Sequence, residues 1–148
     1  MHVPPPVYFA TAFGAAYGLQ RRWPWSLLPE GVDVGVPAGY GLMLVAGLLG
    51  GWGILTFWRH RTPVIPGRPA TSMVTAGPYR FTRNPMYVGL FLLYAGLTLR
   101  LDSVWPLLFV VPLFALLNGH IIPSEERHLA ATFGDDFETF RQRVRRWL

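Results

Sequence analysis

Long uncharged stretches alternate with polar connectors along this chain of 148 residues. Pro37 to Trp58 contains 22 residues without a charge. As a helix this stretch would measure about 33 Å, enough to cross a bilayer core of about 30 Å. Val104 to Ile122 is a second uncharged run, of 19 residues. With two shorter apolar segments, the pattern predicts an all-α fold: a single-domain, polytopic transmembrane helical bundle of about four spans, at residues 4–20, 37–58, 85–99 and 104–122.

Residues 59–84 form the longest polar connector. Its four prolines exclude a continuous helix and predict a loop that folds back over one face of the membrane. Arginine supplies all 13 basic side chains, and ten of them lie between residues 59 and 83 or after Pro123. The positive-inside rule therefore predicts that this loop and both termini are cytoplasmic, in an integral protein of a bacterial inner membrane. No nucleic-acid-binding motif accompanies the charge, so we expect the bilayer rather than a nucleic acid as partner.

The tail, residues 123–148, carries signals for two cytoplasmic helices. Ser124 is available to cap a first helix that ends at Gly134, and Asp135 with Glu138 resembles a capping box for a second. In the second helix apolar residues share one side and arginines occupy much of the rest. This pattern is typical of an amphipathic helix that lies on an anionic membrane surface or packs under the bundle. The apolar side consists of Phe137, Phe140, Val144 and Trp147.

Glycines in the second predicted span favour close packing between helices. Gly47 and Gly51 form a GxxxG pair, which is a helix-packing signal in membranes. The first span is also rich in small residues. Together these features leave room for a homodimer.

A polar, proline-punctuated segment leads directly into the third span. It reads GPYRFTRNPMYVG from Gly77 to Gly89, and it places two arginines, an asparagine and two tyrosines at a membrane boundary. A second motif follows the fourth span. It consists of Glu125-Glu126-Arg127-His128-Leu129, then Phe133-Gly134 and Phe137-Glu138-Thr139-Phe140-Arg141. Because the third and fourth spans form a hairpin, both motifs return to the same side of the membrane.

These motifs and their order resemble the signatures of the isoprenylcysteine carboxyl methyltransferase and phospholipid methyltransferase families. The resemblance covers roughly residues 59–148. It implies a membrane enzyme that uses S-adenosylmethionine to methylate a small or lipid-like acceptor. Asn84 stands where many family members have histidine. Phe137 and Phe140 stand where tyrosine is common, so no phenol hydroxyl is expected to act at those positions.

The resemblance also implies which residues hold the cofactor. Glu125 and Glu126 would face its sulfonium cation or bind another cofactor group, and Arg83 with the N–H groups before the third span would bind its carboxylate. An excess of arginine over bases favours an anionic or thiol acceptor, with Arg80 as the first choice for its clamp and Arg145 as the second. The chain has no cysteine and no metal-ligand spacing, so no metal is expected. The predicted cofactor-binding residues are Tyr79, Arg83, Asn84, Pro85, Tyr87, Gly89, Glu125 and Glu126.

Simpler explanations exist for these side chains. Two carboxylates suit the first turn of a helix, arginines at a membrane face suit positive-inside anchors, and Tyr87 suits the interfacial aromatic belt. Phospholipid amine N-methylation and a non-catalytic membrane binding protein on the same fold stay open as alternative functions. An NADPH-binding sterol reductase is disfavoured because the chain lacks the additional spans of those enzymes.

Overall fold

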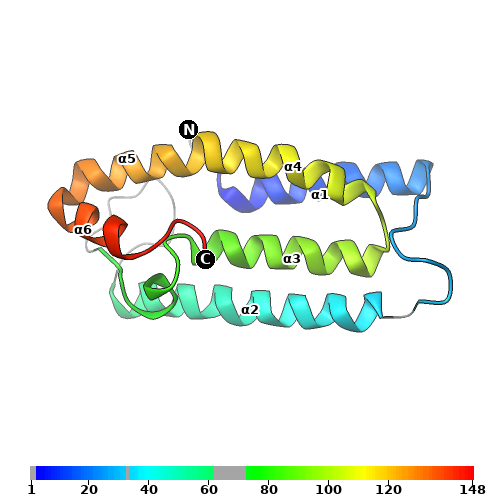
Figure 1. Cartoon of the computed structure of the whole chain (residues 1–148), viewed down its shortest axis with the longest axis horizontal. Helices are drawn as coiled ribbons and strands as arrows, with labels where there is room; N and C mark the ends of the chain where they lie inside the picture. The colour runs from blue at the N-terminus through cyan, green and yellow to red at the C-terminus, as the bar shows by residue number, and fades with distance from the viewer. Residues whose placement is uncertain (1–2, 33, 62–72) are drawn as a thin grey trace.

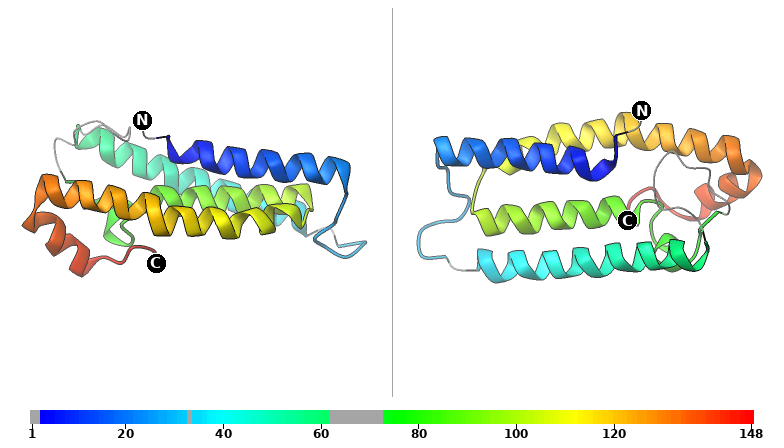
Figure 2. Two further views of the ribbon diagram at one scale, coloured as in Figure 1. Left: turned by 90° about the horizontal axis from the view of Figure 1, so that it is seen from above. Right: turned by 180° about the vertical axis from the view of Figure 1, so that it is seen from behind.

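Four helices lie side by side along the long axis of the molecule (Figures 1 and 2). The computed structural model describes residues 3–32, 34–61 and 73–148. Helix α3 packs along α2, and α1 lies against α4. The all-α prediction is confirmed for the described residues, which contain no strand. The bundle helices are α1 (Pro5–Arg22), α2 (Gly35–Arg59), α3 (Pro85–Leu101) and α4 (Trp105–Leu116).

Two glycines bring α2 and α3 into close contact. A Cβ atom on Gly39 would lie 2.7 Å from the Gly96 oxygen, and one on Gly96 would lie 2.7 Å from the Gly39 oxygen. Any larger residue at either position would push the helices apart. Around Gly47 and Gly51, by contrast, a Cβ atom would meet nothing within 4 Å in the described chain. The predicted GxxxG pair therefore does not mediate packing within the described chain, and its role in a homodimer stays a prediction.

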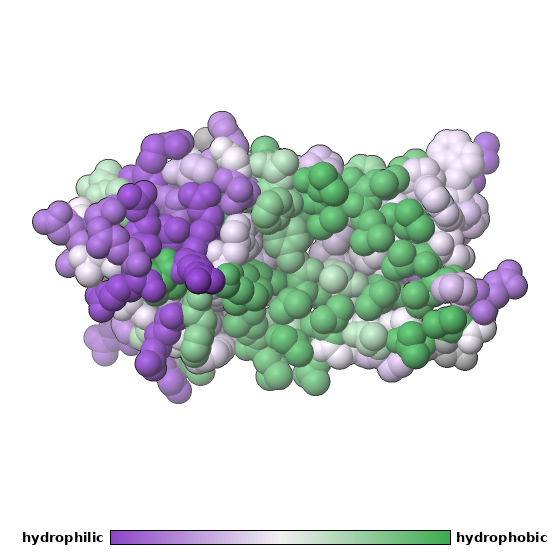
Figure 3. Space-filling model, viewed as in Figure 1, coloured by the Kyte–Doolittle hydropathy of each residue, from purple (hydrophilic) through white to green (hydrophobic). Residues whose placement is uncertain are grey.

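Apolar side chains cover the outside of the bundle rather than only its core. The helices Gly35–Arg59 and Trp105–Phe133 are long and apolar enough to cross a membrane, yet only 17% of the most apolar window of each is buried. Leu48 and Val111 are 66% and 68% exposed. Figure 3 shows the resulting apolar belt between two more polar ends. This surface fits a membrane protein, while the number of spans stays a prediction because α1 and the shorter α3 do not meet the same test.

The fourth predicted span does not end at residue 122. A π-helical turn, η2 (Leu117–Ile121), joins α4 to α5 (Ile122–Phe133) in one continuous helix (Figure 1). The prediction that Ser124 caps a separate helix is therefore wrong, because no helix begins there. The prediction that Gly134 ends this helix is confirmed, and its φ of 51° suits glycine.

The tail folds back toward the bundle after α6 (Asp135–Arg143). The predicted capping box is wrong, because no side chain caps α6 and Glu138 instead accepts a hydrogen bond from Arg141 at 3.0 Å. Val144 is extended, so the predicted helical side chains beyond Arg143 do not continue the helix. Residues 144–148, here named the C-terminal strap, return to the start of α3 (Figure 1).

Phe137 and Phe140 are buried, as the amphipathic pattern predicted. They pack with Val74 and Tyr79, which belong to the described part of the predicted loop 59–84. That part includes a short 3-10 helix, η1 (Gly77–Arg80). Residues 62–72 lie outside the described chain, and the placement of the loop over a membrane face stays a prediction.

Candidate functional site

Tyr87 and Glu125 meet where the start of α3 faces α5. Pro85 is the first residue of α3, where its missing N–H costs nothing, and this start places Tyr87 in the first turn. The Tyr87 hydroxyl lies 3.0 and 3.1 Å from the two Glu125 carboxylate oxygens and donates its single proton between them. Burial raises the pKa of Glu125; the Tyr87 hydrogen bond lowers it, and the negative charge of Glu126 raises it again. A cation bound nearby would favour the charged form of Glu125 and lower this pKa.

Glu126 binds two arginines from distant parts of the chain. Arg83 Nη1 lies 2.8 Å from Glu126 Oε1, and only 12% and 14% of these two side chains are exposed. Arg146, from the C-terminal strap, donates to both Glu126 oxygens through Nε and Nη2. This fork-like contact fixes the carboxylate more firmly than a single hydrogen bond would.

Arg83 is incompletely satisfied by its surroundings. Its Nε and Nη1 atoms are buried and have no hydrogen-bond partner among the described residues, since the Nη1–Glu126 contact is close in distance but poorly directed. Burial lowers the pKa of Arg83, while Glu126 partly restores it. Orphaned donors on a buried guanidinium are costly, and they suit an anionic ligand such as a carboxylate.

The segment before α3 is tied to the C-terminal strap. The Arg146 carbonyl oxygen accepts hydrogen bonds from Thr82 Oγ1 and Asn84 Nδ2, both at 3.0 Å. The Arg83 backbone N–H donates to the Arg145 oxygen at 2.9 Å. Arg145 is exposed, and its predicted role as an acceptor clamp stays a prediction. Sequence reasoning did not name Arg146 as a site residue, yet Arg146 is half-buried and binds Glu126.

Other predicted residues lie in different surroundings. Tyr79 is buried beside Phe57, with a centroid distance of 5.3 Å, and burial raises the pKa of its hydroxyl, with Glu125 adding to the effect. Gly89 faces α2, where a Cβ atom would lie 3.5 Å from the Ala46 oxygen. Arg80 is exposed on η1. The structure thus gathers Arg83, Tyr87, Glu125 and Glu126, with Asn84 and Pro85 beside them, and leaves Arg80 and Gly89 outside the group.

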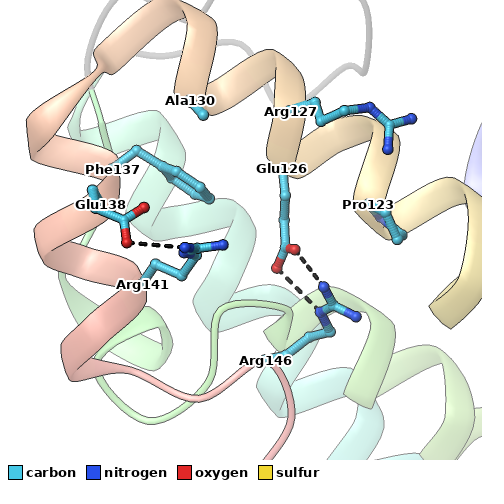
Figure 4. A pocket seen from close by; sticks show the side chains of 8 residues that line it. All are labelled: Pro123, Glu126, Arg127, Ala130, Phe137, Glu138, Arg141 and Arg146. Carbon is cyan, nitrogen blue, oxygen red and sulfur yellow. Dashed lines mark hydrogen bonds and ion pairs between the residues drawn. The ribbon is translucent and has the colours of Figure 1, made fainter.

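A cleft of about 280 Å³ lies beside Glu126, between α5, α6 and the strap (Figure 4). The ring of Phe137 points into it, and charged pairs flank it on both sides. Three arginines and two glutamates make this wall suitable for a polar ligand with charges of both signs. The lining residues are Pro123, Glu126, Arg127, Ala130, Phe137, Glu138, Arg141 and Arg146.

The apolar belt, with a group of polar and charged side chains at one end, fits a helical membrane protein. The sequence model of the phospholipid methyltransferase family matches residues 35–136, which include α2, α3, α4 and α5. The chain belongs to this family. No solved structure matches it.

Curated relatives share part of the chain. The protein-S-isoprenylcysteine O-methyltransferase of Schizosaccharomyces pombe is 37% identical over 73 residues, which are 49% of this chain and 30% of that protein. The nickel-cobalt-cadmium resistance protein NccN of Alcaligenes xylosoxydans xylosoxydans is 34% identical over 80 residues, 54% of this chain and 37% of that protein. An uncharacterized protein of Haemophilus influenzae is 36% identical over 63 residues, 43% of this chain and 100% of its own length.

The chain spans about a third of the length of the first two relatives. One of them is named for a methyltransferase reaction and the other for metal resistance. Within residues 3–32, 34–61 and 73–148, no group of three or more histidine, cysteine, aspartate or glutamate side chains could hold a metal ion.

Proposed function

We propose that this protein is an integral membrane methyltransferase that binds S-adenosylmethionine at the Arg83, Tyr87, Glu125 and Glu126 site. The observation that carries the proposal is the combination of two half-buried carboxylates with a half-buried arginine whose Nε has no hydrogen-bond partner among the described residues. When bound, the cofactor supplies an electrophilic methyl group on a sulfonium cation. Carboxylates on α5 balance such a cation, and the Arg83 Nε donor, which has no partner among the described residues, suits a carboxylate, so the residues present fit this group.

The work of the protein in such a reaction is to align the partners and exclude water. The site joins the first turn of α3 to α5, and the apolar belt covers the neighbouring middle of the bundle (Figure 3), so we propose that an acceptor with an apolar body reaches the site from the bilayer. We propose a four-span arrangement with the polar end and both termini in the cytoplasm, supported by the ten arginines of residues 59–83 and the tail.

For the acceptor, we propose a carboxylate or thiol on an apolar body. Arginines outnumber bases at this end, and an arginine would hold an anionic nucleophile that needs no deprotonation. Arg80 is the first candidate for this clamp because it is exposed at the polar end and forms no ion pair with another described residue. Arg145 is the second, since its backbone oxygen accepts from the Arg83 N–H.

A methyl-transfer assay with labelled cofactor tests the proposal. The acceptors are a prenylated cysteine acid, a fatty acid, an apolar thiol and phosphatidylethanolamine. We expect turnover on one of the first three, and Arg80→Gln should raise KM for an anionic acceptor while Arg143→Gln, an exposed change on α6, leaves it unchanged. Turnover on phosphatidylethanolamine alone would reject the acceptor class and keep the methyltransferase.

Amine methylation is the second candidate, and one observation favours it. The raised pKa of Glu125 makes its carboxylate a better proton acceptor than an ordinary glutamate, and an ammonium group must lose a proton before methylation. In the same assay this alternative predicts turnover on phosphatidylethanolamine that is lost in Glu125→Gln.

A further inference from the structure

The π-helical turn Leu117–Ile121 leaves one main-chain oxygen without its usual partner. The Ile122 N–H donates to the Leu117 oxygen, five residues earlier, so the turn has π-helical register there. In this register each N–H donates to the oxygen five residues earlier, so the Asn118 oxygen would accept from the N–H of residue 123. Pro123 has no N–H. A carbonyl freed in this way inside an apolar helix must find another donor.

The C-terminal strap supplies donors at this position. Arg146 Nη1 lies 3.5 Å from the Asn118 main-chain oxygen and 3.4 Å from its side-chain Oδ1. The indole N–H of Trp147 donates to the same Oδ1 at 3.0 Å. Two consecutive strap residues thus converge on one asparagine, which offers them acceptors from both its backbone and its side chain.

These two strap residues lead in different directions from Asn118. Arg146 forms the fork-like contact with Glu126 at the wall of the cleft. The ring of Trp147 lies between α3 and α4, with centroid distances of 5.9 Å to Phe91 and 5.4 Å to Phe114. Asn118 therefore stands where the polar site joins the apolar belt.

We propose that Asn118 is a positioning residue for this site. It holds Arg146 in the geometry that fixes Glu126, and it holds Trp147 in the aromatic slot between α3 and α4, without contacting the cofactor itself. The π-helical turn and Pro123 are the features that make its carbonyl available; π-helical turns often occur at functional sites. This inference rests on the proposed function in one respect: the expected change in affinity requires that Glu126 binds the cofactor.

Three variants separate this role from general packing. Asn118→Leu removes the side-chain acceptor at similar volume. Asn118→Asp keeps an oxygen for both Arg146 and Trp147, and His120→Leu introduces leucine at an exposed position of the same turn. Calorimetry measures S-adenosylmethionine affinity. Fluorine NMR of protein made with 5-fluorotryptophan reports on Trp147, whose signal is assigned with Trp147→Phe.

We expect Asn118→Leu to weaken S-adenosylmethionine binding roughly tenfold, which corresponds to the loss of about one net hydrogen bond at the site. The Trp147 fluorine signal should shift and broaden in the same variant. Asn118→Asp should restore both the affinity and the signal, and His120→Leu should change neither. The thermal stability of Asn118→Leu and Asn118→Asp is measured alongside. A loss of affinity without a loss of stability assigns the effect to the missing side-chain hydrogen-bond acceptor rather than to a damaged fold.

Each outcome is decisive. An unchanged fluorine signal in Asn118→Leu overturns the proposal, as does an affinity loss that Asn118→Asp does not restore. If the parent protein binds no S-adenosylmethionine, the proposed function fails, and the fluorine signals alone then decide whether Asn118 positions the strap.

Discussion

The two ends of the bundle both contain polar side chains, and they use them differently. At the end opposite the candidate site, Asp102 Oδ1 accepts the backbone N–H groups of Leu27 and Leu28 at 3.1 and 2.9 Å. Ser103 donates to Gln20 at 2.8 Å. These hydrogen bonds tie the end of α1 and the connector that follows it to the turn between α3 and α4.

At the candidate site the polar groups are charged and incompletely satisfied. Glu126 contacts two arginines, Arg83 keeps buried donors without partners in the described chain, and the pKa of Glu125 is raised. A fold tends to satisfy its buried polar groups, and unsatisfied ones gather where a ligand binds. Polar side chains occur at both ends of the bundle, but among the described residues buried side-chain donors without a hydrogen-bond partner occur only at the candidate site.

The largest expected difference between the ends is their location. The candidate site should lie on the cytoplasmic side and the connector of residues 23–34 on the other side, because ten of 13 arginines belong to the site end or its loop. Reporter fusions after Leu148 and within the connector show on which side of the membrane each position lies. We expect a cytoplasmic signal after Leu148 and a periplasmic signal in the connector. A periplasmic reading after Leu148 would reject the four-span arrangement.

Charge removal at the site should reduce affinity and spare the fold. Glu125→Gln or Glu126→Gln loses a charge-assisted contact, which costs about 1.5–3 kcal/mol and weakens S-adenosylmethionine binding roughly 10- to 150-fold for at least one of the two. Calorimetry on purified protein measures the change. Asp135→Asn, an exposed change on α6, is the control. If both glutamine variants bind S-adenosylmethionine as tightly as the parent, the two carboxylates do not bind the cofactor and have only a structural role.

Charge removal at the opposite end should do the reverse. Asp102→Ala leaves two half-buried N–H groups without an acceptor and places alanine at a φ of 48°, so unfolding should become easier by about 1–3 kcal/mol. Thermal unfolding in detergent measures this, while cofactor affinity stays at the parent value. Asp102→Asn keeps the accepting oxygen and should recover most of the stability. Lost affinity in Asp102→Ala without lost stability would contradict the division between the two ends.

The smallest expected effect is a dependence of stability on pH. Because the folded-state pKa of Glu125 is raised above its ordinary value of 4.5, the folded protein holds the Glu125 proton more tightly than the unfolded chain does. This contribution to stability is present below pH 4.5 and is lost as pH rises through the folded-state pKa. Glu125→Gln removes it. The melting temperature of the parent should therefore fall more steeply above pH 4.5 than that of the variant, and parallel curves would contradict the raised pKa.

Sequence reasoning predicted the long helices well because their ends carry strong signals. Arg59 ends the uncharged run of α2, and Pro85 fits the first position of α3. The fourth span was predicted to end at residue 122, with Ser124 capping a separate helix. The π-helical turn lets the helix continue through Pro123, and the spacing of apolar residues does not report such a turn.

The C-terminal strap explains why the site was predicted only in part. Val144 and Trp147 follow Phe140 at helical spacing, so the pattern favoured a longer helix than the one that ends at Arg143. In the strap Arg145 is exposed, whereas Arg146 is half-buried against Glu126 and Asn118, and the sequence pattern does not report which of two neighbouring arginines turns inward. Asn118 had one detectable signal, a proline five residues later, which removes the π-helical donor for its carbonyl.

Native mass spectrometry of the purified full chain tests the central claim most directly. The protein is released from detergent in the presence of S-adenosylmethionine or, separately, NADPH, and the mass of the complex identifies what is bound. The proposed site predicts an adduct of one S-adenosylmethionine on the parent, a weaker adduct on Glu126→Gln, and none with NADPH. An NADPH adduct, or a parent chain that stays free at millimolar S-adenosylmethionine, would contradict it.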